Sequence, residues 1–82
     1  MILRWKKGNE YFIVRMYQDL IGDWVVSQSW GATNSGRYPS YRKTVLPNYD
    51  EARTMVREIR KLRKSQGFRL MARKEVQLGF SF

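Results

Sequence analysis

The residues best suited to chemistry in this 82-residue sequence are basic and gather in its second half. Between residues 53 and 74 stand nine Lys and Arg residues and one acidic residue, a net charge of +8 in a chain whose formal charge is +9. A field concentrated on one segment attracts a polyanion, either nucleic acid or an anionic membrane surface. The candidate phosphate ligands of this segment are Arg53, Arg57, Arg60, Lys61 and Lys64.

The spacing of the arginines is that of one helix face. Arg53, Arg57 and Arg60 stand at i, i+4 and i+7, and a guanidinium group donates two hydrogen bonds to a phosphate. The alternative is a solvated face kept basic for solubility, but solubility is commonly served by mixed charges. One acid among nine bases favours phosphate contact. About six to nine such contacts, mostly independent of base sequence, would cost several powers of ten in affinity over a few-fold rise in salt.

A second candidate site is Trp30-Gly31, where a predicted strand meets a polar loop. A Trp at this place can turn its ring outward and stack on a sugar or a base. It can equally cap the hydrophobic core, as most Trp residues of a small domain must. The residue pattern leaves both roles open.

The sequence contains few side chains that are suited to catalysis. The chain has no His and no Cys, so the commonest general base, the commonest metal ligand and any thiolate are missing. The acids are scattered: Asp19 and Asp23 flank a turn, Asp50 and Glu51 start a helix, and Glu58 stands among arginines. No pair has the spacing of a metal site or of an acid/base dyad. We therefore expect a protein that is not an enzyme and uses no cofactor.

The elements that must position these residues begin with two strands. Residues 10–18 and 24–30 are rich in aromatic and β-branched side chains, and residues 19–23 between them predict a hairpin connection in which Gly22 takes a positive φ. Alternation along each strand places every second residue on a common face. The faces so formed are Phe12, Val14 and Met16 in the first strand, and Trp24, Val26 and Trp30 in the second.

A third strand and a helix follow. Residues 37–46 contain the third strand, and Pro39 predicts that it lies at a sheet edge or starts after the proline. Asn48 and Glu51 form a capping box for a helix over residues 49–66, which Gly67 ends. The apolar stripe of this helix is Ala52, Met55, Val56, Ile59 and Leu62.

Together these elements predict an α+β fold: an antiparallel sheet of three to five strands with one amphipathic helix packed on a face. The 82 residues form one domain with a core over about 10–68. Residues 68–73 predict a short further strand, and the segment from 69 to 82 is a C-terminal strand or a tail. Arg42 and Lys43 would extend the basic patch if the third strand borders the helix.

Residues 11–68 resemble a WGR domain, the DNA-binding module of DNA-dependent poly(ADP-ribose) polymerases and of many bacterial proteins of uncertain role. The resemblance covers about 58 residues. The features that carry it are the segment 19–24 (DLIGDW), Trp30-Gly31, the loop closing on Gly36-Arg37, Pro47-Asn48 leading into the Glu51-Ala52 helix, and Gly67-Phe68.

The resemblance implies an antiparallel sheet flanked by a helix and binding of DNA near a break. By the family's pattern, Trp30 would pack against the sugar of a terminal nucleotide and Gly31 would allow close approach. Position 32 departs from that pattern, because Ala32 stands where the family has its motif Arg. In the polymerases that Arg also passes the DNA signal to the catalytic domain. Arg37, five residues on, is the nearest candidate for an anion contact in its place.

The last six residues, 77–82 (QLGFSF), resemble the short Gln-Leu-rich peptides by which bacterial replication and repair proteins dock on the sliding clamp. The alternative is a final strand that packs Phe80 or Phe82 on the core.

The sequence thus predicts a nucleic-acid-binding module, with DNA favoured over RNA as its partner. The alternative is a protein-interaction adaptor domain in a bacterial DNA-processing system. We expect a cytoplasmic monomer without a membrane partner, and no apolar run approaches the roughly 18 residues that cross a bilayer. A membrane-surface role ranks third, because the apolar stripe of the helix is needed for the core. The basic start, Met1–Lys7, is followed by no apolar segment, so we do not expect a signal peptide.

Overall fold

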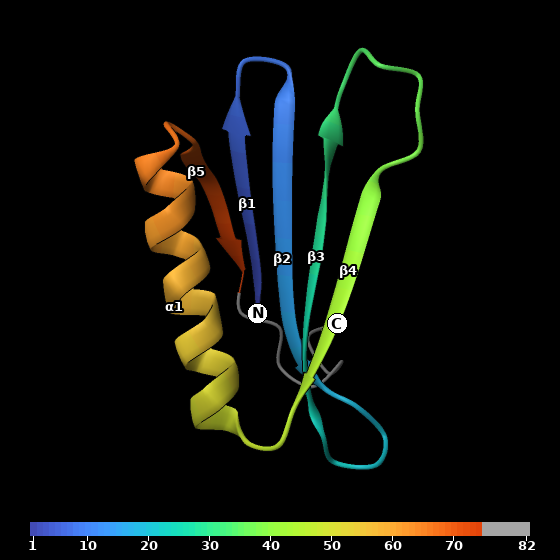
Figure 1. The fold of residues 1–82 in the computed structure, drawn as a ribbon, viewed down its shortest axis with the longest axis vertical. Coiled ribbons are helices and arrows are strands. Elements are labelled where there is room, and N and C mark those ends of the chain that lie inside the picture. The colour runs from blue at the N-terminus through green and yellow to red at the C-terminus, as the bar shows by residue number, and fades with distance from the viewer. Residues whose placement is uncertain (75–82) are drawn as a thin grey trace.

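The computed structural model describes residues 1–74, which form a five-stranded antiparallel sheet with one helix packed on it (Figure 1). The predicted α+β class is confirmed. The strands lie in the order β4-β3-β2-β1-β5. The possible clamp-docking peptide at 77–82 falls outside the described residues. The elements are β1 (Ile2–Lys7), β2 (Glu10–Gln18), β3 (Trp24–Ala32), β4 (Ser40–Leu46), α1 (Tyr49–Ser65) and β5 (Arg69–Lys74).

The β2–β3 hairpin forms the centre of the sheet. Its pairing runs without a bulge from Glu10 opposite Ala32 to Gln18 opposite Trp24. Oδ1 of Asp19 accepts hydrogen bonds from backbone N–H groups in the connection, and Gly22 has a φ of 93°. The predicted hairpin is therefore confirmed, and so is the common face of its second strand, because the register is unbroken.

Strand β1 was not predicted. It lies between β2 and β5, and its residues Leu3 and Trp5 are buried while Arg4 and Lys6 are exposed. This alternation is that of a strand with one covered face. The hydrophobic core consequently begins before residue 10, the boundary expected from the sequence.

Strand β4 starts directly after Pro39 and is an edge strand, as the proline predicts. At the opposite edge β5 pairs with β1, with a register shift between Arg4 and Trp5. The short strand predicted over 68–73 is therefore present, displaced by one residue.

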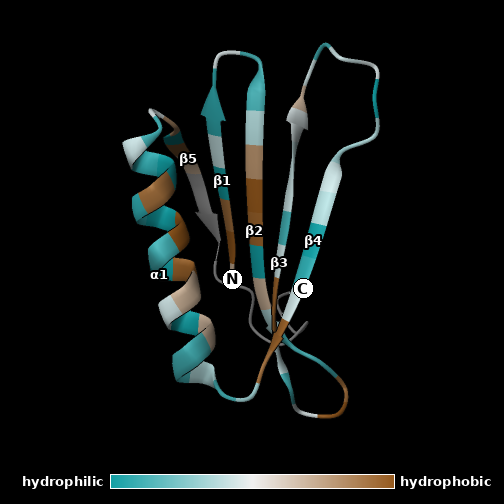
Figure 2. Cartoon of the chain, viewed as in Figure 1, coloured by the Kyte–Doolittle hydropathy of each residue, from teal (hydrophilic) through white to brown (hydrophobic). Residues whose placement is uncertain are grey.

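Helix α1 begins and ends where its capping residues predict. Oδ1 of Asn48 accepts a hydrogen bond from the backbone N–H of Glu51 at 2.9 Å, and Gly67 follows the helix with a φ of 86°. Figure 2 shows the apolar side of α1 turned toward the strands and its hydrophilic side turned away. Leu62 departs from the predicted stripe, since 47% of its surface is exposed.

Replacing Asn48 by Ala is expected to destabilise the domain by about 1 kcal/mol, because the N–H of Glu51 loses its acceptor. For a domain of this size the melting temperature should fall by about 4–8 °C. Thermal unfolding measured by circular dichroism tests this, and Asn48→Asp, which keeps an acceptor oxygen, should melt close to the native protein. An unchanged melting temperature for Asn48→Ala would contradict a capping role.

The helix crosses the sheet obliquely, which leaves one corner of the sheet uncovered. At its start, Tyr49 packs edge-on against Trp24 of β3, with ring centroids 5.0 Å apart. Near its end, the backbone oxygen of Gln66 accepts a hydrogen bond from Nζ of Lys7, at the end of β1, at 2.7 Å. The open corner is therefore formed by the end of β3 and the start of β4.

Candidate nucleic-acid interface

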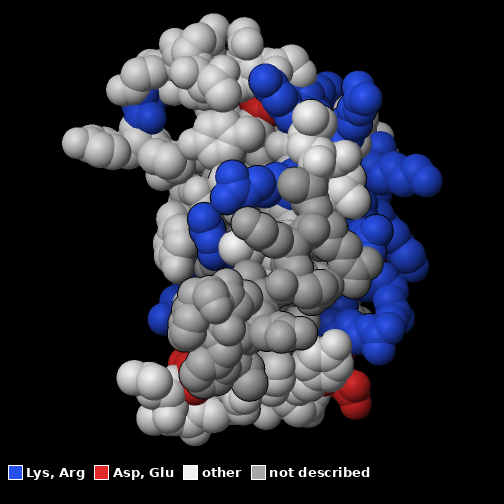
Figure 3. Space-filling model, turned by 180° about the vertical axis from the view of Figure 1, so that it is seen from behind, with Lys and Arg blue, Asp and Glu red and all other residues white. Residues whose placement is uncertain are grey.

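The basic face of α1 gathers five cations on one element of the described structure. It consists of residues that the amphipathic pattern turns away from the core, and each is exposed. From behind, Figure 3 shows Lys and Arg gathered along the side of the molecule where α1 lies, with few acidic residues near them. The five members of the basic face are Arg53, Arg57, Arg60, Lys61 and Lys64.

These cations are almost free of acidic partners. Among the described residues the one ion pair joins Lys61 to Glu58, with 3.9 Å between Nζ and Oε1. Both side chains are more than half exposed, and such a pair contributes little to stability. Arg53, Arg57 and Arg60 have no carboxylate within ion-pair distance in this part of the chain. Within residues 1–74 these guanidinium groups are therefore unpaired and can meet an external anion.

A cleft of about 500 Å³ lies between the basic face and β5. Trp5, Phe68 and Leu70 supply its apolar side chains, and all its other lining residues are members of the basic face. Phe68 is half-buried and packs against the core. The basic face therefore borders an apolar surface rather than bare solvent.

Arg42 and Lys43, which would extend the basic patch if their strand borders the helix, point to opposite faces of β4. Arg42 pairs with Gln28, which faces the helix side, and Lys43 pairs with Ser27 and so faces the opposite side. Arg37 lies in the exposed β3–β4 loop, which Figure 1 shows at the far side of the sheet from α1. Only Arg42 shares a surface with the helix side.

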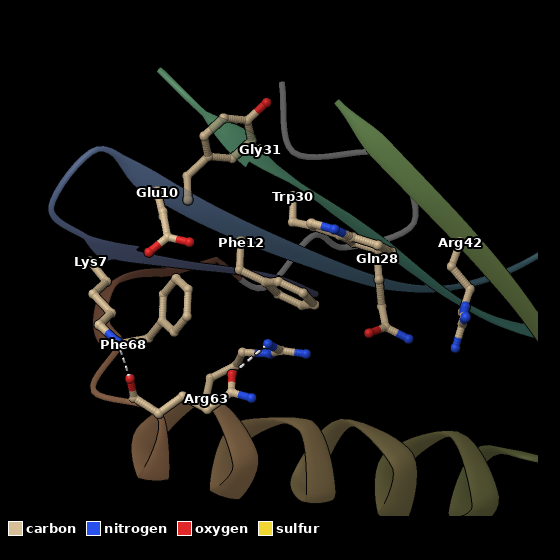
Figure 4. A pocket seen from close by; sticks show the side chains of 11 residues that line it. Lys7, Glu10, Phe12, Gln28, Trp30, Gly31, Arg42, Arg63 and Phe68 are labelled. Carbon is tan, nitrogen blue, oxygen red and sulfur yellow. Dashed lines mark hydrogen bonds between the residues drawn. The ribbon is translucent and has the colours of Figure 1, made fainter. Parts of the chain in front are cut away.

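The uncovered corner of the sheet holds a second depression, the corner groove, of about 570 Å³. It runs from the C-terminal end of α1 over the end of β1, the start of β2 and the end of β3 to Arg42 of β4 (Figure 4). Its lining combines aromatic side chains with three basic residues, two amides and one acid. The residues that matter to its chemistry are Lys7, Phe12, Gln28, Trp30, Arg42, Arg63 and Phe68.

Trp30 packs against the core, and its other predicted role, stacking on a sugar or a base, stays a prediction. Its ring stacks on Phe12, with centroids 5.7 Å apart and planes 12° apart, and it packs against the core. The same residue is only half-buried and lines the corner groove. Gly31 has a different neighbour: a Cβ there would lie 2.9 Å from the hydroxyl oxygen of Tyr11. The space beside Gly31 is thus taken by the Tyr11 side chain.

Arg63 and Gln28 were not among the predicted site residues, although both carry a signal. Arg63 stands four residues after the buried Ile59 and seven after Val56, so a basic residue occupies a position of the apolar stripe. Gln28 stands between Val26 and Trp30 on the helix-side face of β3. A polar residue at a buried position of an amphipathic pattern is informative, because burial without a partner is costly.

The guanidinium group of Arg63 lies on the ring of Phe12, with 3.8 Å between Cζ and the ring centroid. Its Nη1 donates a hydrogen bond to Oε1 of Gln66 at 2.6 Å. Burial lowers the pKa of Arg63, because removal from water disfavours the charged form. The aromatic face offsets part of that cost. A cation is therefore held inside the groove wall with no acidic partner among the described residues.

No helix of the described residues is long and apolar enough to cross a membrane. A scan against protein-family models found no match, and searches of curated proteins and of solved structures found none either.

Proposed function

We propose that this protein is a non-enzymatic nucleic-acid-binding domain that holds the phosphate backbone, of DNA rather than RNA, on the basic face of α1. The observation that carries the proposal is that this face presents five exposed cations, of which one, Lys61, forms an ion pair with an acid within the described residues. Backbone phosphates along a duplex are regularly spaced anions, and Arg and Lys are their usual partners in proteins.

The rigidity of α1 supports this function. Ala52, Val56 and Ile59 fix the helix against the sheet, so its cations keep a constant spacing. A fixed array of charges loses less conformational entropy on binding than a mobile tail with the same charge. The resemblance to a WGR domain adds a second contact, in which Trp30 meets a nucleotide at a DNA end. Because Ala32 replaces the motif Arg, we assign no signalling role to this contact.

The double substitution of Arg57 and Arg60 by Gln tests the proposal. Titration of labelled duplex DNA at several salt concentrations should show weaker binding, and the slope of log affinity against log salt should become shallower by about 2. The matched control is the double substitution of Arg37 and Lys43 by Gln, which removes the same charge away from the basic face. Its slope should stay near that of the native protein.

Equal losses in the two double variants would show that net charge, and not the basic face, governs binding. Absence of any binding to duplex DNA in dilute buffer would reject the proposed function outright. The experiment therefore separates a site from a general electrostatic attraction.

A protein-interaction adaptor is the second candidate function. It is favoured by the β2–β3 hairpin, where Leu20 and Ile21 are exposed to 105% and 84%. Exposed aliphatic side chains at adjacent positions are common in protein contacts. An adaptor without a nucleic-acid function predicts no binding in the same titration at low salt, so one experiment distinguishes the two.

A further inference from the structure

The side-chain amide of Gln28 faces the corner groove, and no described residue pairs with it. Gln28 is 8% exposed, and no hydrogen bond to its amide group is formed within the described part of the chain. Figure 4 shows the amide directed into the groove, toward the same space as the guanidinium groups of Arg42 and Arg63. Among the described residues Nε of Arg63 is the buried side-chain polar atom without a partner, whereas the Gln28 amide is open to the groove, so a ligand with matching donors and acceptors can replace the solvent there.

The groove offers flat surfaces beside this amide. The Arg63 guanidinium rests on the ring of Phe12 and forms no ion pair within the described residues, and Trp30 stacks on the same phenyl ring. Guanidinium planes and aromatic rings are the surfaces on which unpaired bases stack. The combination favours a planar ligand.

Gln28 also discriminates between classes of ligand. A phosphate or a carboxylate has only acceptor oxygens, so it would pair with the amide N–H groups and leave the amide oxygen unpaired. The edge of adenine presents a donor and an acceptor side by side, N6 and N7, and Gln binds that edge with two hydrogen bonds. The amide therefore fits a base better than it fits a simple anion.

The charges of the groove agree with a nucleotide. Arg42 is exposed at the groove and can reach a phosphate, whereas the one acid of the lining, Glu10, stands near Lys7 at the other end (Figure 4). Phe68 lines both the corner groove and the cleft beneath the basic face. The two depressions therefore adjoin at Phe68.

We propose that the corner groove binds an unpaired adenine base, with its edge on Gln28, its ring against Arg63 and Trp30, and its phosphate near Arg42. The inference rests on the proposed function, because it makes the preferred ligand a duplex that carries a single-stranded, adenine-containing extension.

The test compares labelled duplexes that are blunt, that carry an oligo-dA extension or that carry an oligo-dT extension. The native protein should bind the dA extension about 10-fold more tightly than the dT extension. Gln28→Leu should remove that preference and leave the affinity for the blunt duplex unchanged. Arg42→Gln changes an exposed residue and does not burden folding, so it serves as the second variant. It should weaken binding of both extensions several-fold, and more than it weakens binding of the blunt duplex.

Three results would overturn the inference. Equal affinity of the native protein for dA and dT extensions is one, and survival of the preference in a folded Gln28→Leu protein is another. The third concerns an acidic poly-Glu peptide. If this peptide binds the native protein without displacing the duplex or the extension, and no longer binds Arg42→Gln, then the groove holds the peptide and the extension lies elsewhere, which would identify a protein ligand. Retained blunt duplex binding in these cases leaves the proposed function standing, whereas loss of all DNA binding rejects both.

Discussion

Binding to duplex DNA is expected to weaken about 500-fold when the salt concentration rises from about 50 to about 200 mM. The basic face supplies five exposed cations, and each phosphate that they neutralise releases condensed counterions. Five contacts give a slope of log affinity against log salt of about −4.5. Fluorescence anisotropy of a labelled duplex over a series of salt concentrations measures this slope directly.

The expected slope is shallower than the one that the sequence alone predicts, because the sequence indicates about six to nine phosphate contacts and the structure places five cations on the basic face. Lys43 faces the other side of the sheet, and Arg63 is held against Phe12 in the groove wall. A measured slope shallower than about −2 would mean that the basic face does not lie along the phosphates. A slope steeper than about −7 would require basic residues beyond this face.

Replacing Phe12 by Ala is expected to destabilise the domain by about 3–5 kcal/mol. Phe12 is 3% exposed and connects the sheet to the C-terminal part of α1. Its ring packs edge-on against Trp5 at 6.1 Å between centroids, stacks on Trp30 and carries the guanidinium group of Arg63. Small domains have a total stability of about 5–15 kcal/mol, so this loss would leave a large unfolded fraction in mild denaturant.

Chemical denaturation followed by tryptophan fluorescence measures the loss. The matched control is Tyr38→Ala, which removes an aromatic ring that is 99% exposed in the β3–β4 loop. Its free energy of unfolding should change by no more than about 0.5 kcal/mol. Comparable stabilities for the two variants would mean that Phe12 is not the packing centre that its contacts indicate.

Local signals predicted the parts of the fold that are built from neighbouring residues. The hairpin between β2 and β3 follows from alternation and from Gly22, and α1 follows from Asn48 and Gly67. Each of these is decided within a few residues of the chain. The edge position of β4 followed in the same way from Pro39.

The sequence could not reveal features that depend on distant pairing. Strand β1 is rich in basic residues. The alternation of Leu3 and Trp5 with basic residues is recognisable as a strand only when β2 and β5 pair with its two edges. The corner groove likewise exists because α1 crosses the sheet obliquely, which no local pattern specifies. Gln28 and Arg63 were visible as polar residues at apolar positions, but their meeting in one groove depended on that crossing.

The position of β1 also constrains the order in which a nascent chain can complete its fold. Strands β1 to β4 pair each with its predecessor and can assemble as they leave the ribosome. The outer edge of β1 stays open until β5 is synthesised, some 60 residues later. Unpaired strand edges are templates for aggregation, so a chain shortened before Arg69 would keep an unpaired edge on β1 that β5 otherwise covers.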